Sequence, residues 1–338
     1  MNIHSADGDD NSESAQELGF KKDASEGREA FMIYKTEEKK ILTKQVCLSG
    51  GITFPVLTFA DWEGLAGIRH CFTTREGGVS EGYLASLNFR QGLYDPQENI
   101  VENFRRAAAF FETVPERIVC AQQTHTANVR VVTEADAGKG VVRDRDYTDV
   151  DGLITDIPGL VLYTSHADCV PLYFYDPVRR VIALSHSGWK GTVSRIGAVT
   201  IGRMSKIYGC RPEDIYAAIG PSICVDCYEV SEDVAEMFIQ CFDANPEKGS
   251  AGDPPGETAG AEVIPHILKK GRRPGKYQLD LWQANARILM EAGITPEHLT
   301  VTNLCTCENS TELFSHRATD GKRGNQGAFL MLVPQQIG

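Results

Sequence analysis

Two apolar runs joined by turn residues constrain the fold of this chain more than any other feature. Residues 170–175 are apolar and aromatic, residues 176–180 favour a turn, and residues 181–184 are apolar again, which is the pattern of a β-hairpin. If the turn is centred on Pro177-Val178, Cys169 and His186 lie directly opposite each other. Opposed residues of an antiparallel pair have Cβ atoms about 4.5–5.5 Å apart, a distance that a zinc ion can bridge. The hairpin therefore predicts a small chemical site at its open end.

A third ligand is available at the start of another expected strand. His125 precedes residues 128–133, which alternate like a strand, so it is expected where a loop meets a sheet. His125, Cys169 and His186 would give zinc three protein ligands and an open fourth position, which is the catalytic form of zinc coordination. Alternatives remain open, because His166 is a rival ligand and Cys169 could be a nucleophile with His186 as its base and no metal. The histidines could also be solvated side chains at strand ends, and Cys169 could be a small buried thiol that only packs.

Positive charge near the hairpin suggests an anion site. Lys190 stands where the hairpin leads into an expected helix, whose first backbone N–H groups favour phosphate. Arg75 and Arg317 are further candidates for binding a phosphate or a carboxylate. His316 is a candidate for contacting substrate or for supporting the residues that do. A glycine-rich turn between a strand and a helix is also common for geometric reasons alone, so both readings stand.

The periodicity of the whole chain predicts helices and strands that mix without regular alternation. This order favours an α+β fold with mixed or antiparallel sheets over a doubly wound parallel sheet. Residues 43–338 are expected to form a single domain, residues 1–42 a polar, loosely ordered tail, and residues 245–275 a long surface loop. The expected helices are 98–111, 192–208, 231–242 and 281–293, and the expected strands are 68–74, 128–133, 152–155, 160–164, 215–219, 299–303 and 328–333.

Composition excludes some classes of partner. The 338 residues include 34 basic and 46 acidic side chains, and the net charge of −12 argues against a nucleic-acid backbone as the main partner. No apolar run approaches the roughly 20 residues that cross a bilayer, so no membrane is expected. The polar N-terminus lacks the apolar region of a signal peptide, which predicts a cytoplasmic location.

Ten cysteines are spread along the chain, and in the cytoplasm they should be reduced. Cys224 and Cys227 form a C-x-x-C pair, and Cys305 and Cys307 lie far downstream. A four-cysteine zinc site from these two pairs would have unusual spacing, so partly buried cysteines beside a turn are favoured. A non-enzymatic redox or zinc-sensing protein built on the two pairs is kept as an alternative.

Nine short motifs, in order along the chain, resemble those of the laccase-domain or "polyphenol oxidase" family. Any one of them is weak, but nine in sequence are specific. Within them, Asn88 and Asp168 are candidate substrate contacts. The motifs are TTREGGVS (73–80), SLN (86–88), QTH (123–125), DGL (151–153), ADC (167–169), HSGWKG (186–191), GPSI (220–223), YEV (228–230) and FSHR (314–317).

The resemblance implies a layered sandwich of mixed sheets flanked by helices, and zinc ligands at His125, Cys169 and His186. It also implies phosphorolysis of adenosine, inosine, guanosine and methylthioadenosine, and hydrolytic deamination of adenosine. Purine nucleosides and inorganic phosphate would then be the ligands, with Asp168 or His316 handling a proton. Zinc is the expected metal and copper the alternative, although a multicopper oxidase needs many histidines, often in His-X-His pairs, and this chain has eight with no such pair. A zinc amidase that edits a peptidoglycan precursor is a further alternative.

Overall fold

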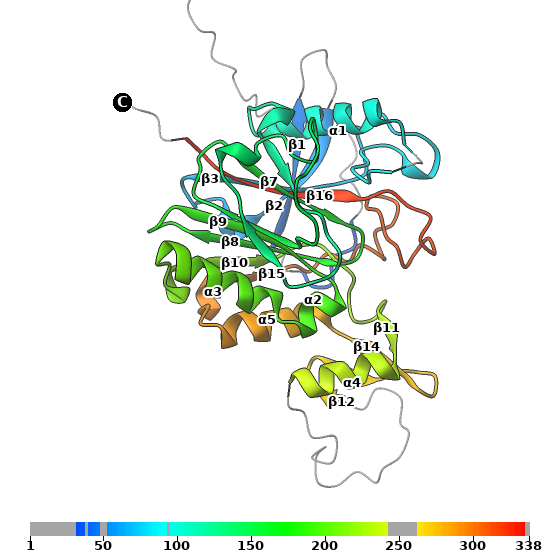
Figure 1. Cartoon of the computed structure of the whole chain (residues 1–338). Coiled ribbons are helices and arrows are strands. Elements are labelled where there is room, and N and C mark those ends of the chain that lie inside the picture. Colours follow the sequence, from blue (N-terminus) through cyan, green and yellow to red (C-terminus); the bar gives the residue numbers. More distant parts are fainter. Residues whose placement is uncertain (1–31, 38–39, 48–52, 93–94, 243–261, 335–338) are drawn as a thin grey trace, which may run out of the picture. The chain divides into compact units, whose positions relative to one another are not determined.

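The computed structural model describes residues 32–37, 40–47, 53–92, 95–242 and 262–334 (Figure 1). In these residues the strands form two six-stranded sheets and one four-stranded sheet. The first sheet has the order β1 (Ile41–Cys47), β2 (Thr53–Phe59), β3 (Ile68–Thr73), β16 (Gln326–Leu332), β7 (Val161–His166), β4 (Ile118–Cys120). The second has the order β15 (Leu299–Val301), β10 (Tyr216–Ile219), β8 (Val170–Asp176), β9 (Val181–Ser187), β6 (Gly152–Thr155), β5 (Val129–Val131). The third has the order β11 (Glu229–Ser231), β14 (Lys276–Leu279), β13 (Leu268–Lys270), β12 (Glu262–Ile264).

The α-helices of the described residues are α1 (Gln97–Phe110), α2 (Trp189–Val193), α3 (Ile196–Tyr208), α4 (Glu232–Cys241) and α5 (Leu281–Glu291). Short 3-10 turns lie at Ala60–Trp62, Gly82–Leu84, Pro115–Arg117, Glu134–Asp136, Pro212–Asp214 and Pro296–His298. Strand pairs β4–β7, β5–β6 and β10–β15 are parallel, and the other pairs are antiparallel. The predicted mixed-sheet α+β fold is therefore confirmed. None of the helices in the described ranges is long and apolar enough to span a membrane.

The two large sheets pack face to face, and helices cover their outer faces. Every residue of β8 is buried, because one face of the strand packs on helices and the other on the first sheet. Leu172 faces the helices, whereas the Tyr173 hydroxyl donates to the Cys71 carbonyl of the first sheet at 2.9 Å. On the far side of the first sheet, the Phe104 ring of α1 lies 5.0 Å from the Tyr163 ring. This layering explains the unbroken apolar run that the hairpin shows in sequence.

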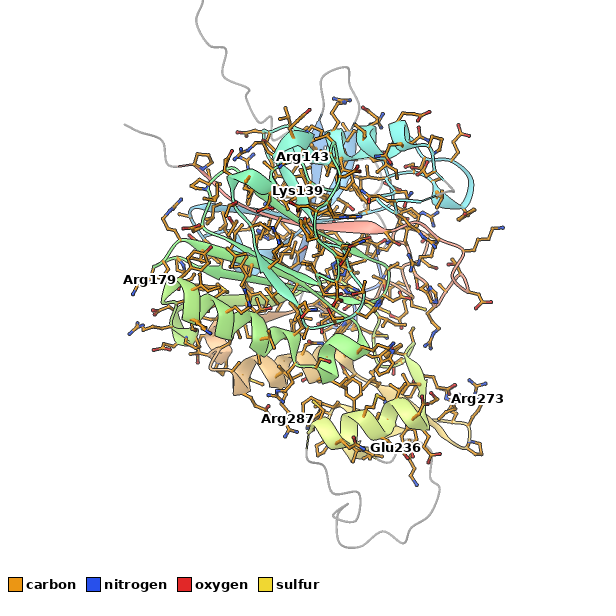
Figure 2. The ribbon with its side chains drawn as sticks, viewed as in Figure 1. Lys139, Arg143, Arg179, Glu236, Arg273 and Arg287 are labelled. Atoms are coloured by element: carbon orange, nitrogen blue, oxygen red, sulfur yellow. The ribbon has the colours of Figure 1, made fainter. Side chains whose placement is uncertain are left out.

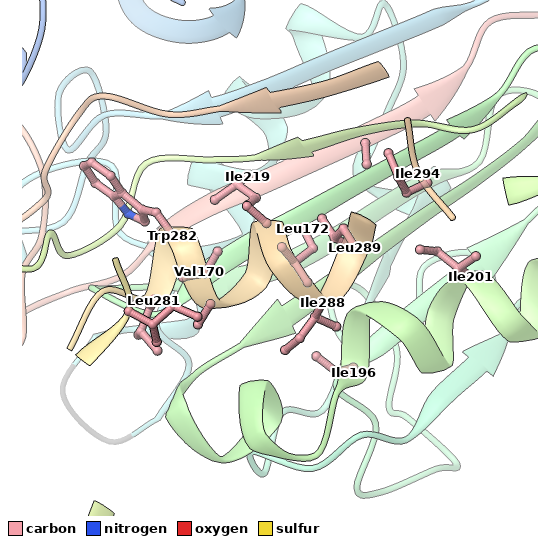
Figure 3. Close-up of a cluster of buried hydrophobic side chains, with 14 of the residues drawn as sticks. Val170, Leu172, Ile196, Ile201, Ile219, Leu281, Trp282, Ile288, Leu289 and Ile294 are labelled. Carbon is pink, nitrogen blue, oxygen red and sulfur yellow. The ribbon is translucent and has the colours of Figure 1, made fainter. Parts of the chain in front are cut away.

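The main core lies between the second sheet and helices α3 and α5 (Figure 3). Ile196, Leu172 and Leu289 meet there, and all three are fully buried. A Cβ on Gly197 would lie 2.9 Å from Leu289 Cδ2, so the missing side chain lets α3 approach α5 closely. This packing holds α2 and the start of α3 against the end of β9, where the candidate site begins.

The hairpin forms as predicted, but its register differs by two residues. Pro171 pairs with His186, so Cys169 is a diagonal neighbour of His186 and not its direct partner. The turn contains four residues between Asp176 and Val181, and it is therefore centred one residue later than expected. The Asp176 carboxylate organises this turn by accepting the backbone N–H groups of Val178 and Arg179, at 2.8 and 2.9 Å.

Three other expectations about local structure differ from the fold. The expected helix at 192–208 is two helices, because Arg195 adopts a left-handed conformation with φ 56° between α2 and α3. Part of the expected loop at 245–275 forms strands: β12, β13 and β14 build the third sheet, and residues 243–261 lie outside the described residues. Ile264 and Leu268 are buried in the main core, which explains why these strands form among polar residues.

The expected tail at 1–42 also ends earlier than predicted. Met32 is buried, Tyr34 forms an isolated bridge with Leu304, and Ile41 begins β1. Residues 1–31 lie outside the described residues.

On the third sheet and α4, exposed charged side chains such as Glu236 and Arg273 project from the ribbon (Figure 2).

Candidate functional site

His125, Cys169 and His186 come together from three segments of the second sheet's rim. His125 lies in the loop between β4 and β5, Cys169 in the turn between β7 and β8, and His186 near the end of β9. Their potential ligand atoms all lie within 4.8 Å of one another. His186 is buried, Cys169 is half-buried and His125 is exposed, so the cluster has one side open to solvent. The structure thus assembles the three residues on which the sequence prediction depended.

Asp151 positions both histidines. Its Oδ1 accepts the Nδ1–H of His186 at 2.8 Å and the backbone N–H of His125 at 3.1 Å. Its Oδ2 accepts the backbone N–H groups of Thr124 and Thr126, at 2.9 and 3.0 Å. The carboxylate is fully buried, and hydrogen bonding to His186 keeps its pKa below the usual range despite the opposing effect of burial. Because Asp151 occupies Nδ1 of His186, Nε2 of that ring is left to face the cluster.

Two neighbours of Cys169 shape its turn and are not ligands in this arrangement. His166 uses both ring nitrogens, one with the Cys169 carbonyl at 3.0 Å and one with the Thr164 hydroxyl at 2.8 Å. Asp168 has φ 90°, and its carboxylate accepts the Thr306 hydroxyl at 2.7 Å and the Arg317 backbone N–H at 2.6 Å. The rival ligand His166 therefore holds the turn, and Asp168 ties it to the chain's C-terminal part.

The electrostatics of the cluster favour a thiolate. Burial alone would raise the pKa of the Cys169 thiol, but the positive charge of His186 and hydrogen bonds from both histidines lower it to about 6. Burial opposes the charged form of His186, yet the Cys169 thiolate and the Asp151 carboxylate raise its pKa to about 9. A thiolate at this position can bind a metal or act as a nucleophile.

Gly188 leaves the space that the cluster needs. Its φ of −74° suits any residue, so backbone conformation does not require glycine here. A Cβ at this position would instead lie 3.0 Å from Cys169 Sγ and 3.0 Å from His125 Cδ2. The glycine in the HSGWKG motif thus keeps the ligand atoms free of a side chain.

The donor set fits zinc. Two imidazoles and one thiolate are zinc ligands, and Cys169 Sγ lies 3.9 Å from His125 Nε2. A tetrahedral zinc ion would hold such a sulfur and nitrogen about 3.6 Å apart, so only a small shift is needed. The carboxylate behind His186 is the support that metal-binding histidines usually have. With three protein ligands, one position is left for a substrate or water.

The cluster opens into a cavity of about 280 Å³. Besides the cluster, three arginines line this cavity: Arg90, Arg145 and Arg323. The remaining lining residues are Phe89, Gln91, Ala121, Gln122, Gln123, Tyr163, Ser165, Ala167 and Asn325. Three buried side-chain atoms in this lining have no hydrogen-bond partner in the part of the chain that the structure describes, namely Gln122 Oε1, Tyr163 Oη and Arg323 Nε. A polar ligand would therefore find both charge and unsatisfied hydrogen-bonding groups here.

The three arginines are held by neutral groups. Arg90 donates to the Arg323 carbonyl at 3.0 Å, and Arg145 donates to the Ala121 carbonyl at 3.1 Å and to Gln91 at 3.2 Å. The Arg323 guanidinium donates to the Gly324 carbonyl at 3.3 Å and to Asn325 Oδ1. Burial lowers the pKa of Arg323, and the charge of Arg90 lowers it further. Guanidinium groups that repel one another in a partly buried cavity favour an anion.

The other residues named from the sequence lie outside the cavity wall. Arg75 lines a separate hollow, where its guanidinium donates to the Ala85 carbonyl at 2.8 Å and stacks on Phe314. Lys190 and His316 are exposed. The Arg317 guanidinium donates to the Cys227 and Glu229 carbonyls, at 2.9 and 3.0 Å.

Asn88 lies behind the cavity wall. Its Oδ1 accepts the backbone N–H groups of Arg90 and Asn325, at 2.8 and 2.9 Å, and its Nδ2 donates to Asp95 at 2.7 Å. Asn88 is fully buried, so it supports two lining residues and does not itself reach the cavity.

Sequence reasoning missed Asp151 and the three cavity arginines. Asp151 was visible as the first residue of the DGL motif, directly before a strand that pairs with the hairpin. Arg90, Arg145 and Arg323 come from three irregular segments far apart in sequence, and no local pattern marks them.

Comparison with known proteins agrees with the fold and the motifs. The family model described as multi-copper polyphenol oxidoreductase laccase matches residues 69–333. Purine nucleoside phosphorylase YlmD of Bacillus subtilis is 37% identical over 263 residues, which are 77% of this chain and 86% of that protein. Adenosine deaminase RL5 of an unknown prokaryotic organism is 31% identical over 202 residues, which are 59% of this chain and 69% of that protein.

Among solved structures, the hypothetical protein YfiH of Bacillus licheniformis matches with a TM-score of 0.70 and 33% identity, covering 82% of this chain and 96% of that one. The resemblance predicted from the nine motifs is therefore confirmed. Because its family model matches this chain from β3 to just past the end of β16, the chain belongs to the multi-copper polyphenol oxidoreductase laccase family.

Proposed function

We propose that this chain is a zinc-dependent enzyme that cleaves purine nucleosides with phosphate and also deaminates adenosine. The observation that carries the proposal is the open His125–Cys169–His186 cluster at the wall of a cavity that also holds three arginines. Relatives named purine nucleoside phosphorylase, and one named adenosine deaminase, support the same substrate class. The expected substrates are adenosine, inosine, guanosine and methylthioadenosine.

The chain's own residues have distinct tasks in this proposal. When bound, zinc in such an open site supplies Lewis acidity and activates water. His125, Cys169 and His186 hold the metal, and Asp151 keeps His186 in the correct tautomer. Arg90, Arg145 and Arg323 bind and orient phosphate, so that one of its oxygens can attack C1′ of the ribose while the bond to the base breaks.

The arginines replace the phosphate contacts expected from the sequence. Arg145→Gln should raise the KM for phosphate at least tenfold, because a charged contact with an anion contributes about 1.5–3 kcal/mol. Arg143→Gln is the matched control: Arg143 is exposed and donates to the Ala137 carbonyl at 2.7 Å, away from the cavity. An Arg145→Gln enzyme with an unchanged KM for phosphate would remove these arginines from the proposal.

The test of the reaction combines metal analysis with product analysis. Purified protein is expected to contain zinc, to release base and ribose 1-phosphate from inosine only when phosphate is present, and to convert adenosine to inosine without phosphate. His125→Ala and His186→Ala should each lose zinc and both activities. Full activity in either variant, or no turnover of any nucleoside by the zinc-loaded chain, would refute the proposal.

The two alternatives give different results in the same experiment. A zinc amidase would release an amino acid from a peptidoglycan precursor and leave nucleosides unchanged. A cysteine-based sensor would keep its metal in His125→Ala and lose it when Cys224 or Cys305 is replaced. Copper in place of zinc in the active fraction would change the metal and not the ligands.

A further inference from the structure

A second group of metal-ligand atoms lies outside the cavity. The thiols of Cys224, Cys227 and Cys305 all lie within 4.8 Å of one another. Cys224 and Cys305 are buried, whereas Cys227 is half-buried, and all three thiols are free. The sequence favoured partly buried cysteines beside a turn, because Cys305 is far from the other two along the chain. The fold brings Cys305 next to Cys224 and Cys227 despite their separation in sequence.

Parallel pairing of β10 with β15 brings the two turns together. Cys224 and Cys227 follow β10, and Cys305 follows β15. Ser222 and Cys305 form a parallel bridge directly beyond the paired strands. The Cys224 backbone N–H then donates to Cys305 Sγ at 3.3 Å, which holds the two turns together.

Glu308 supplies a fourth donor. Its Oε1 lies 3.8 Å from Cys224 Sγ and 3.9 Å from Cys227 Sγ. Its Oε2 is buried and has no hydrogen-bond partner within the described residues. A tetrahedral zinc ion would hold thiolate and carboxylate ligands about 3.6–3.8 Å apart, which these two distances fit. Glu308 is grouped with Cys224 and Asp226 in this structure, so zinc binding would also draw its carboxylate toward Cys305. The spacing also repeats, because Cys224 and Cys227 are three residues apart, as are Cys305 and Glu308.

One lysine contacts the carboxylates beside this group. The Lys35 ammonium donates to Glu308 Oε1, which leaves Oε2 as the carboxylate oxygen without a partner among the described residues, and to Asp226 at 3.0 Å. Three thiolates and a carboxylate around a divalent cation would carry net negative charge, and this lysine, which also pairs with Asp226, offsets only part of it.

The geometry points to a second, closed zinc site formed by Cys224, Cys227, Cys305 and Glu308. Four protein ligands with no open position are typical of structural zinc, in contrast to the open cluster at His125. Cys307 is outside the three-thiol group and is not assigned to the metal.

This site would brace the turn that carries Cys169. Thr306, which follows the ligand Cys305, donates to Asp168, and the Ile223 N–H before Cys224 donates to the Asp168 carbonyl at 3.0 Å. Arg317 links Asp168 to the Cys227 carbonyl, because its backbone donates to the first and its guanidinium to the second. Zinc at the four-ligand site would thus hold the segment next to the open cluster in place.

The test is zinc stoichiometry of the full chain, purified under reducing conditions. We expect two zinc ions per wild-type chain, one in Cys227→Ser, one in Glu308→Gln, one in His125→Ala, and none in the Cys227→Ser/His125→Ala double variant. Cys307→Ser, which changes a half-buried thiol of the same turn, should keep both ions. A single zinc that His125→Ala removes would overturn the second site, and loss of an ion in Cys307→Ser with retention in Glu308→Gln would overturn the role of Glu308.

A measurement on the wild-type chain does not depend on the folding of any variant. Alkylation followed by mass spectrometry should label Cys227 slowly in the native protein and rapidly after a chelator is added. Equal labelling with and without chelator, or a disulfide between any of the three cysteines in the reduced preparation, would refute the inference. Loss of nucleoside turnover alone bears only on the proposed function, so the two can fail separately.

Discussion

Replacing Asp151 by asparagine should weaken either the folding stability of the chain or its affinity for zinc, because this carboxylate positions both histidines of the cluster. Oδ1 of the carboxylate accepts the His186 Nδ1–H and the His125 N–H, and Oδ2 accepts the Thr124 and Thr126 N–H groups and the Thr126 hydroxyl. An asparagine offers one oxygen and one NH₂ group. Whichever way it is placed, a donor replaces an acceptor on one side.

The magnitude follows from the two placements. If the NH₂ group faces the threonine amides, two partly buried N–H groups lose their acceptor, at the lower end of about 1–3 kcal/mol each, which gives about 2 kcal/mol. If it faces His186, the ring must shift its proton from Nδ1 to Nε2 and can no longer bind a metal through Nε2, while the His125 N–H is left unpaired. The first placement costs folding stability and the second costs metal affinity.

Urea unfolding of the metal-free chain and zinc competition with a chelator measure the two costs. We expect Asp151→Asn to lose at least about 2 kcal/mol of unfolding free energy or at least about tenfold in zinc affinity. Asp149→Asn is the matched control: Asp149 is half-buried, contacts Thr124 and Asn128 from the same loop as Asp151, and has φ 58°, which asparagine tolerates. If Asp151→Asn behaves like this control in both assays, the buried carboxylate does not position the histidines.

Three further outcomes follow from single contacts. Gly188→Ala should weaken zinc binding about 10- to 100-fold, measured by chelator competition, while unfolding of the metal-free chain changes by less than about 1 kcal/mol, because only the ligand space is invaded. Asp136 is buried, and burial opposes its ionisation, but hydrogen bonds from Lys139, the Thr133 backbone and Arg130 lower its pKa to about 2. The ionised carboxylate therefore contributes about 2 kcal/mol to the free energy of unfolding above pH 4, and this contribution is lost as the pH falls toward 2. Asp136→Asn should therefore flatten urea-unfolding stability across that acidic window, and parallel curves for the variant and wild type would contradict this. Phe104→Ala should lower the free energy of unfolding by about 3–5 kcal/mol, because the ring is fully buried between α1 and the first sheet. A loss below about 1 kcal/mol in urea unfolding would show that neighbouring side chains fill the space that the ring leaves.

The sequence by itself determined the elements that depend on local pattern. The apolar run of β8 predicted a buried strand, and the run of β9 predicted its partner. Both predictions were possible because the hydrophobic pattern of a buried strand is visible in a few consecutive residues. The same hairpin placed Cys169 and His186 at one end, and the loop before the expected strand at 128–133 offered His125 as the third ligand. Its register, however, depended on the side chain of Asp176, which caps a four-residue turn that composition alone did not specify.

Only the tertiary structure decided which distant groups meet. Arg90, Arg145 and Arg323 share one cavity because three irregular segments converge there, and irregular segments carry no periodic signal. Cys305 reaches Cys224 because β10 and β15 pair in parallel, which depends on the whole second sheet. Asp151 became a support for two histidines only once the Thr124–Thr126 backbone wrapped around it. Local sequence pattern determines which segments form strands and helices, whereas long-range packing determines which side chains lie next to one another. The candidate sites of this chain depend on such contacts between residues that are distant in sequence.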